Sequence, residues 1–282
     1  MKVTVSFVVL TYNRVDALVP VLHALAAQCE ARHEVVIADD GSNAQALEAL
    51  RRQLPEFRCA VKHVWHPDRG FTASRARNLG ALASVGDYLV FLDGDCIPNP
   101  KFVKAHEALM QKGCFVNGNR VLLSEGFTQQ VISGEVNLTN AKVTDWLLWR
   151  IKGDVNKLAH LLYWPQAPGR RQPQFHWKQI RSCNFAMWKD DFLQVNGFDE
   201  SFEGWGHEDA DLVLRLHHLG RCRLNGFFCT EVYHLWHRQN SRVSESVNYQ
   251  RVVDRMQTDI VSASKGVRDS LNASDVVVSL LN

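Results

Sequence analysis

The sequence lacks long apolar runs and long blocks of like charge. No stretch approaches the length that spans a bilayer, which argues against a transmembrane helix. The formal net charge is only +2, which argues against a nucleic-acid partner, because such partners need clustered basic residues. The first ten residues interleave polar with apolar residues, as a strand does, and lack the form of a signal peptide. We therefore expect a cytoplasmic protein, with peripheral contact at the inner face of a membrane as a further expectation.

Cysteine spacing typical of zinc sites is also missing. The seven cysteines are odd in number and scattered, and no C-x-x-C pair occurs among them. A reduced compartment is the simplest expectation. The content of 46% hydrophobic and 22% charged residues is that of an ordinary globular protein.

The glycine-rich signatures of two common nucleotide sites are absent. Neither G-x-G-x-x-G nor G-x-x-x-x-G-K-[ST] follows the first apolar segment. A bound pyrophosphate would therefore not be held by a glycine-rich helix start. A metal that bridges the diphosphate is the other common solution, and it requires carboxylates.

Strand-like and helix-like patterns alternate through the first 112 residues. This alternation predicts an α/β fold with a mostly parallel central sheet flanked by helices. Strands are expected at 3–10, 34–38, 59–65 and 87–92, with helices at about 15–28, 44–54, 71–84 and 100–112. A further strand is expected at 114–123.

Polar residues follow three of the predicted strands. The strongest case is Asp93-Gly94-Asp95, which follows the apolar segment 88–92. Carboxylates at the carboxyl end of a buried parallel strand suit a hard divalent cation. The alternative for this triplet alone is a solvated Asp-Gly turn.

The ends of the first two strands carry Thr11-Tyr12-Asn13-Arg14 and Asp39-Asp40-Gly41-Ser42. Asp39 and Asp40 taken alone could be turn or helix N-cap residues. Arg69, Arg75 and Arg77 lie near the start of the third helix, where a cation opposes the helix dipole. They predict either an anion site or a solvated basic face.

Regular patterning fails between 124 and 181, where four tryptophans are concentrated. We expect an irregular aromatic-rich insertion that forms a sugar-stacking surface or a small satellite core. After position 240 the pattern predicts one amphipathic helix at about 246–262 and a tail.

Two polar clusters lie in the last third of the chain. Glu208, Asp209 and Asp211 begin a predicted helix, where acids also simply complement the helix dipole. His234 and His237 follow a short apolar stretch. A histidine pair is more often structural, but an imidazole facing Asp95 would favour Mn²⁺ over Mg²⁺.

Together these motifs resemble those of family 2 glycosyltransferases with the GT-A fold, a Rossmann-like arrangement. The resemblance is carried by Phe7–Arg14, Asp39–Ser42, Arg75–Gly80 and Leu92–Asp95. The segments 205–211 and 234–237 resemble the C-terminal part of β-1,4-galactosyltransferases and of bacterial chondroitin-type polymerases. One departure is His207, where those enzymes usually carry glycine.

The resemblance implies a role for each matching residue. It implies that the donor nucleotide is held by Thr11, Tyr12, Arg14, Asp39, Asp40, Arg75, Arg77 and Asp93. It implies that Mn²⁺ or Mg²⁺ is bound by Asp95 together with His234, His237 or both, with Asp93 contacting the metal or the ribose. Asp209 would be the general base, with Glu208 beside it, and Asn184, Trp205 and Gly206 would contact the donor or acceptor sugar.

The resemblance also implies an activity and a division of the chain. We expect inverting, metal-dependent transfer from a UDP-sugar of the Gal, GalNAc, GlcNAc or GlcA class to a hydroxyl of a glycan or glycolipid, in surface polysaccharide synthesis. A single GT-A domain would cover 1–240, with a nucleotide-sugar-binding part at 1–123, the insertion at 124–181 and an acceptor part at 182–240. A helical extension would follow at 241–282. The alternatives are a metal-dependent phosphohydrolase with Asp93 as nucleophile and a sugar-binding module without turnover.

Overall fold

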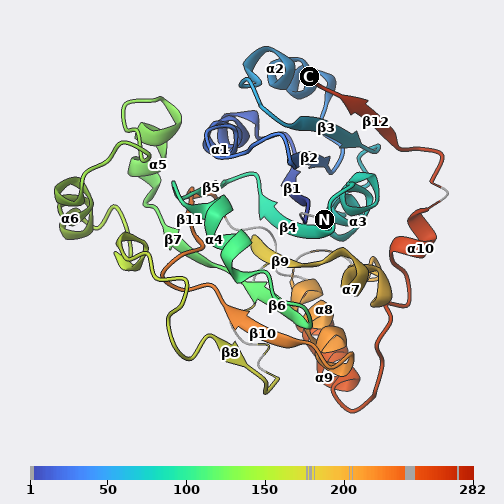
Figure 1. Ribbon diagram of the computed structural model, residues 1–282. Helices are drawn as coiled ribbons and strands as arrows, with labels where there is room; N and C mark the ends of the chain where they lie inside the picture. The colour runs from blue at the N-terminus through green and yellow to red at the C-terminus, as the bar shows by residue number, and fades with distance from the viewer. Residues whose placement is uncertain are drawn as a thin grey trace.

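The computed structural model describes residues 3–175, 177, 180, 182–202, 204, 206–238, 245–271 and 273–282. Within these residues, a nine-stranded sheet has the order β12-β3-β2-β1-β4-β9-β6-β10-β8, and a smaller sheet has the order β5-β11-β7. Figure 1 shows helices on both faces of the large sheet. The predicted α/β class is confirmed.

The first part of the large sheet is parallel. Its elements are β1 (Val5–Thr11), α1 (Val15–Ala26), β2 (His33–Asp39), α2 (Ala44–Gln53), β3 (Ala60–Trp65), α3 (Ala73–Ala83) and β4 (Tyr88–Asp93). Strand β1 lies between β2 and β4, with Thr11 opposite Asp39 and Leu10 opposite Asp93. Because these strands run in parallel, their carboxyl ends meet at one edge of the sheet.

The central strands are buried on both faces, which explains their continuous apolar runs. Phe7 and Val9 of β1 pack with Leu18 of α1 in one core cluster. Val8 of β1 packs with Leu79 of α3 in the other cluster. Successive side chains of a strand point to opposite faces, so a strand between two helix layers needs apolar residues at every position.

The second part of the sheet is mixed. Strand β9 (Asn184–Trp188) is antiparallel to β4 and β6 (Cys114–Asn117), and β10 (Cys222–Asn225) is parallel to β6 and antiparallel to β8 (Arg171–Gln172). The smaller sheet contains β5 (Cys96–Pro98), β11 (Glu231–His234) and β7 (Asn119–Leu122). The remaining helices here are α4 (Phe102–Leu109), α7 (Lys189–Gln194) and α8 (Glu208–His218).

The prediction of one strand at 114–123 is wrong. The chain divides at Gly118, so that β6 joins the large sheet and β7 joins the small one. A Cβ atom on Gly118 would lie 2.1 Å from Cγ of Asn184. Only glycine allows this approach, and it therefore permits the change of sheet.

The insertion at 124–181 is more regular than the sequence predicts. It contains α5 (Glu125–Ile132), α6 (Val143–Lys152) and the short 3-10 helix η1 (Ala159–Leu161). The period of α6 escapes detection because large apolar residues occupy both its buried and its exposed side.

The segment at 241–282 was predicted to be helical, and this is incomplete. Helix α9 (Glu245–Arg255) is present but ends before 262, and α10 (Val267–Ser270) is a single turn. Strand β12 (Val277–Leu280) pairs antiparallel with β3 and belongs to the large sheet. Its partner lies far away in sequence, so no local pattern predicts it.

None of the helices in the described ranges combines the length and apolar character that crossing a bilayer requires.

Candidate active site

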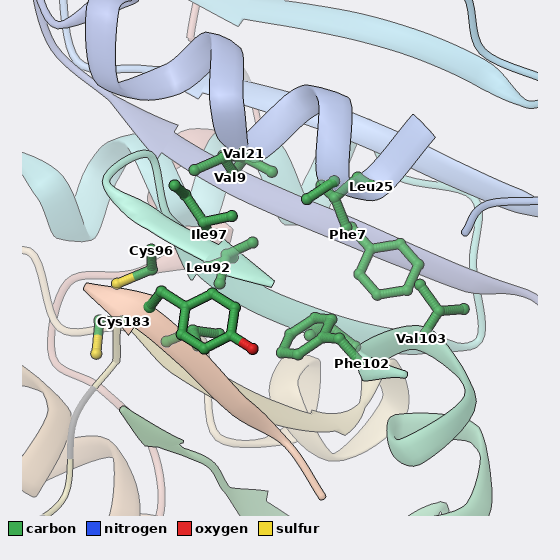
Figure 2. Packing of buried hydrophobic residues seen from close by; sticks show 14 of the residues in the cluster. Phe7, Val9, Val21, Leu25, Leu92, Cys96, Ile97, Phe102, Val103 and Cys183 are labelled. Carbon is green, nitrogen blue, oxygen red and sulfur yellow. The ribbon is translucent and has the colours of Figure 1, made fainter. Parts of the chain in front are cut away.

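The Asp93-Gly94-Asp95 turn is fixed by the end of β1. The N–H of Gly94 donates a hydrogen bond to the carbonyl oxygen of Leu10 at 2.7 Å, and a Cβ on Gly94 would lie equally close to that oxygen. Glycine is therefore required by contact with the neighbouring strand. The next residues, Cys96 and Ile97, are buried in the hydrophobic core (Figure 2). Their packing anchors the turn to the core.

Three of the predicted metal ligands lie together. Ligand atoms of Asp95, His234 and His237 all fall within 4.8 Å of one another. The Nε2 atoms of His234 and His237 lie 3.9 and 3.4 Å from carboxylate oxygens of Asp95. A carboxylate with two imidazoles suits Mn²⁺ or another borderline divalent cation. Burial lowers the pKa of His234, which favours the neutral imidazole that metals require.

The small sheet brings the histidines to the turn. Strand β11 pairs with β5 so that His234 lies opposite Cys96. The N–H of Leu235 donates to the carbonyl oxygen of Asp95 at 2.9 Å. These backbone bonds join two segments that are 139 positions apart, counted from Asp95 to His234. Both histidines thus face the same carboxylate, and the geometry does not choose between them.

Asp93 lies outside this group and is held by Arg77. The guanidinium of Arg77 lies 2.8 Å from Asp93 and 3.5 Å from Glu208. Burial would lower the pKa of Arg77, but the carboxylates of Asp93 and Glu208 outweigh burial and raise it. Arg77 is 3% exposed. This buried cation therefore joins the Asp93-Gly94-Asp95 turn to Glu208, the first residue of α8.

Asp209 has the electrostatics of a base that works near neutrality. Burial, followed by the charge of Glu208, raises the pKa of Asp209 to about 7. Its carboxylate accepts hydrogen bonds from the N–H groups of Ser182 and Ala210, at 3.2 and 2.7 Å. These bonds fix the carboxylate at the start of α8, beside the ion pair of Glu208 with Arg77.

The residue before α8 departs from the usual backbone. His207 has a φ of +71°, in the left-handed region that favours glycine. The resembling enzymes usually carry glycine at this position, and the conformation explains that preference. The His207 ring packs between Trp177 and Tyr249. Gly206 has a φ of +106°, and the predicted sugar contact Trp205 lies outside the described residues.

The residues predicted to hold the nucleotide form a second group at the ends of β1 and β2. The N–H of Asp40 donates to the carbonyl oxygen of Thr11, and the phenol of Tyr12 donates to Asp68 at 2.8 Å. The Tyr12 side chain is 46% exposed and offers a stacking surface. Arg14 pairs with Asp16.

Both carboxylates after β2 have protein partners. Asp39 accepts from the N–H of Ser42 at 2.7 Å and lies 2.9 Å from Nε2 of His63. Asp40 accepts from the N–H and hydroxyl of Thr72. It also lies 3.3 Å from Nε2 of His66. The turn reading of Asp39 is thus correct, and its nucleotide role stays a prediction.

Sequence reasoning missed these two histidines. His63 lies on β3 and His66 follows its end, and both are buried. The only available signal was a pair of histidines within and just after an apolar strand, which is not specific.

One predicted nucleotide contact, Arg75, does not reach Asp93. Arg75 pairs with Asp275 at 2.9 Å, and Glu200 lies 3.8 Å away. Residues two apart on a helix face different directions, so Arg75 is turned away from Asp93 while Arg77 reaches it. Exposed Arg69 also pairs with Asp275.

Asn184 is 1% exposed. Its amide donates to the carbonyl oxygens of Asn119 and Thr230 and faces His106 at 3.3 Å. With these bonds made inside the core, Asn184 holds β9 to the small sheet, and its role as a sugar contact stays a prediction.

Two family models match the chain. Residues 6–163 match the model described as glycosyl transferase family 2. Residues 170–238 match the model described as the N-terminal domain of galactosyltransferase. The first match includes the Asp93-Gly94-Asp95 turn and Arg77, and the second includes Asp209 and both histidines.

Two relatives illustrate the similarity. The validoxylamine A glucosyltransferase of Streptomyces hygroscopicus subsp. jinggangensis is 30% identical over 234 residues, which cover 75% of this chain and 51% of that enzyme. The chondroitin synthase of Escherichia coli is 27% identical over 229 residues, which cover 76% of this chain and 32% of that enzyme. The chain thus spans about half the length of the first relative and about a third of the second.

Solved structures show the same fold at low identity. GalNAc-T7 with UDP, GalNAc and Mn²⁺ superposes with a TM-score of 0.55 at 16% identity, covering 89% of this chain and 48% of that chain. The mannosyltransferase PcManGT of Pyrobaculum calidifontis, with GDP-Man and Mn²⁺, gives 0.55 at 14% identity, covering 90% and 62%. Since its first family match alone covers more than half of its length, the chain belongs to glycosyl transferase family 2 and has the GT-A fold.

Proposed function

We propose that this chain transfers a sugar from a UDP-sugar to a hydroxyl of a glycan or glycolipid, with inversion at the anomeric carbon. The observation that carries the proposal is the chain of charges Asp93, Arg77 and Glu208, in which Arg77 is buried and the two carboxylates are partly exposed. It joins the metal turn to α8 next to Asp209, whose pKa suits a base. Hence a donor group and an acceptor group can meet at one place.

The residues divide the chemistry between them. Asp209 accepts the proton of the acceptor hydroxyl as that oxygen attacks the anomeric carbon. The Tyr12 ring stacks on the nucleobase of the donor. Asp95, His234 and His237 would hold a divalent cation, which when bound would neutralise charge on the departing diphosphate. Arg77 orients Asp93 through their ion pair.

The choice of donor and of biological role rests on relatives. The structures of GalNAc-T7 and of Staphylococcus aureus TarS contain UDP or a UDP-sugar, which supports a UDP-sugar, whereas PcManGT contains GDP-Man. Similarity to chondroitin synthase and to the hyaluronan synthase of Pasteurella multocida supports a polysaccharide product. The family match favours transfer over the phosphohydrolase and binding-module alternatives.

The test is a thermal-shift panel with UDP, GDP, dTDP and CMP, each with and without Mn²⁺. A ligand that binds only the folded state raises the unfolding midpoint. Stabilisation by UDP that requires Mn²⁺ and is lost in Asp95→Ala supports the proposal. UDP-sugars and glycan acceptors are then screened for UDP release. A larger shift with GDP would contradict the donor class, and no shift with any nucleotide would contradict transfer itself.

A further inference from the structure

Helix α6 presents an apolar surface that nothing in the described chain covers. Val143, Leu147, Leu148 and Ile151 are 59%, 46%, 54% and 83% exposed. At about 100° per residue, these four positions span an arc of about 140° on one side of the helix. Large apolar side chains clustered in this way mark an interaction surface more often than single exposed ones do.

The opposite side of α6 is firmly packed. The Trp146 ring stacks on Tyr233 of β11, with centroids 4.9 Å apart and planes at 27°, and also contacts His160. Trp149 packs on Phe127 of α5 at 4.8 Å. The helix therefore cannot turn its exposed residues inward without breaking this aromatic cluster. Figure 1 shows α6 at the periphery, away from the large sheet.

The charges around the arc are basic. Arg150 and Lys152 lie at its two borders by the same helical geometry, and both are exposed. Of the two nearby acids, Asp145 lies outside the arc by the same geometry, and Asp154 follows the end of the helix. Asp145 accepts from the N–H of Lys142 at the helix start, and Asp154 accepts from the hydroxyl of Ser124. An apolar arc bordered by two cations, with no acid inside it, is complementary to a lipid surface with anionic headgroups.

We propose that α6 docks on an anionic lipid bilayer, with its four apolar side chains in the interface and its basic residues at the headgroups. The inference does not rest on the donor or on the reaction. Its consequence for the site follows from Tyr233, which stacks on α6 and directly precedes His234. Docking would therefore hold the metal-binding strand close to the membrane surface, where a lipid-linked acceptor would be presented.

The test is co-sedimentation of the full chain with vesicles of phosphatidylcholine alone or mixed with phosphatidylglycerol. We expect binding to the anionic vesicles, weakened at raised ionic strength. The double variant Leu147→Glu/Ile151→Glu should bind at least tenfold more weakly. Arg150→Gln/Lys152→Gln should lose about fivefold for each charge removed. Unchanged unfolding midpoints would show that these exposed substitutions leave the fold intact.

The matched control is Val247→Glu, which places the same charge on an apolar residue of α9 that is 57% exposed. It should bind like the parent chain. The proposal is overturned by absence of binding to anionic vesicles, by equal binding to neutral vesicles, or by loss of binding in the α9 variant alone. It is also overturned if α6 proves to be a contact between two copies. Light scattering would then show a dimer that Leu147→Glu/Ile151→Glu dissociates, without vesicle binding.

Discussion

Two regions of the molecule contribute to the candidate site in different ways. The proposed donor half, residues 3–95, builds its share from the parallel strands β1, β2, β3 and β4, with polar residues at the carboxyl ends of β1, β2 and β4. The acceptor half, residues 182–238, supplies Asp209, His234 and His237 through α8 and β11, which reach the turn by long-range pairing. Because Asp209 lies outside the group of Asp95, His234 and His237, its mutation should separate transfer from donor binding.

The largest expected effect separates them most sharply. Asp209→Asn keeps one acceptor oxygen, for the N–H of either Ser182 or Ala210, but removes the base. We expect turnover to fall by about a thousandfold, within the usual range for acid–base groups, while the Mn²⁺-dependent shift with UDP persists. Radiolabelled transfer and thermal shift would be measured on one preparation. A variant that also failed to bind UDP would refute the assignment of Asp209 to the acceptor half.

Asp95→Ala should act in the opposite way, on binding itself. At a UDP concentration about 100 times Kd, the parent chain gains about 2.7 kcal/mol from the ligand, and this gain should vanish in the variant. His234→Ala and His237→Ala should each reduce it. Asp190→Ala, an exposed carboxylate on α7, is the control and should retain the full shift. Equal loss in that control would remove the metal interpretation.

Arg77→Met should affect both halves at once, because its guanidinium lies between Asp93 and Glu208. Removing one partner of a buried ion pair typically costs about 3 kcal/mol or more, which urea unfolding would detect. UDP affinity and turnover should both decline. Arg75→Met is the matched control. It breaks the pairs with Asp275 and Glu200 but should leave the UDP shift intact, and a loss there would return Arg75 to the site.

The pH dependence should report Asp209 in two independent ways. Since its pKa is raised to about 7, turnover should fall about tenfold per pH unit below 7, as the base becomes protonated. When the pKa of a carboxyl is higher in the folded than in the unfolded protein, the folded state loses stability as the pH rises from the unfolded pKa to the folded pKa. The stabilisation of Asp209→Asn over the parent should thus grow from about pH 4 to about pH 7 and then level off. A stability difference that is independent of pH would contradict the raised pKa.

The smallest effect concerns His207 in the acceptor half. Its left-handed backbone conformation destabilises the folded state by about 1 kcal/mol. Its ring contacts stabilise the folded state by about 0.5–1.5 kcal/mol. His207→Gly should therefore change stability by less than about 1 kcal/mol. His207→Ala loses the ring without relieving the backbone, so it should be less stable than the glycine variant by about 1 kcal/mol. Equal stability of the two variants in urea unfolding would exclude backbone strain.

Sequence alone predicted the donor half well. The alternation of strands and helices predicts where Thr11, Asp39 and Asp93 lie, because each sits at the carboxyl end of a parallel strand and these ends meet at one edge of the sheet. The bridging role of Arg77 was not predicted. Residues two apart on a helix point in different directions, and only the tertiary structure shows which of Arg75 and Arg77 faces the turn.

The acceptor half was predicted mainly through the family resemblance. No local pattern shows that Asn184 is enclosed by the small sheet, because its partners lie on the segments after Gly118 and before β11. The grouping of both histidines with Asp95 likewise depends on pairing between β5 and β11. In α6, apolar residues on two sides of the helix obscured its period. None of the described residues covers its exposed side.

Strand β12 has one more consequence. By pairing with β3, it covers hydrogen-bonding groups that would otherwise form the open edge of a parallel sheet. An unpaired edge strand is a template for association with other chains, and short strands limit that hazard. Four residues replace six as the outermost strand. The segment that follows α9 in sequence thus shields the β3 edge of the large sheet from association with other chains.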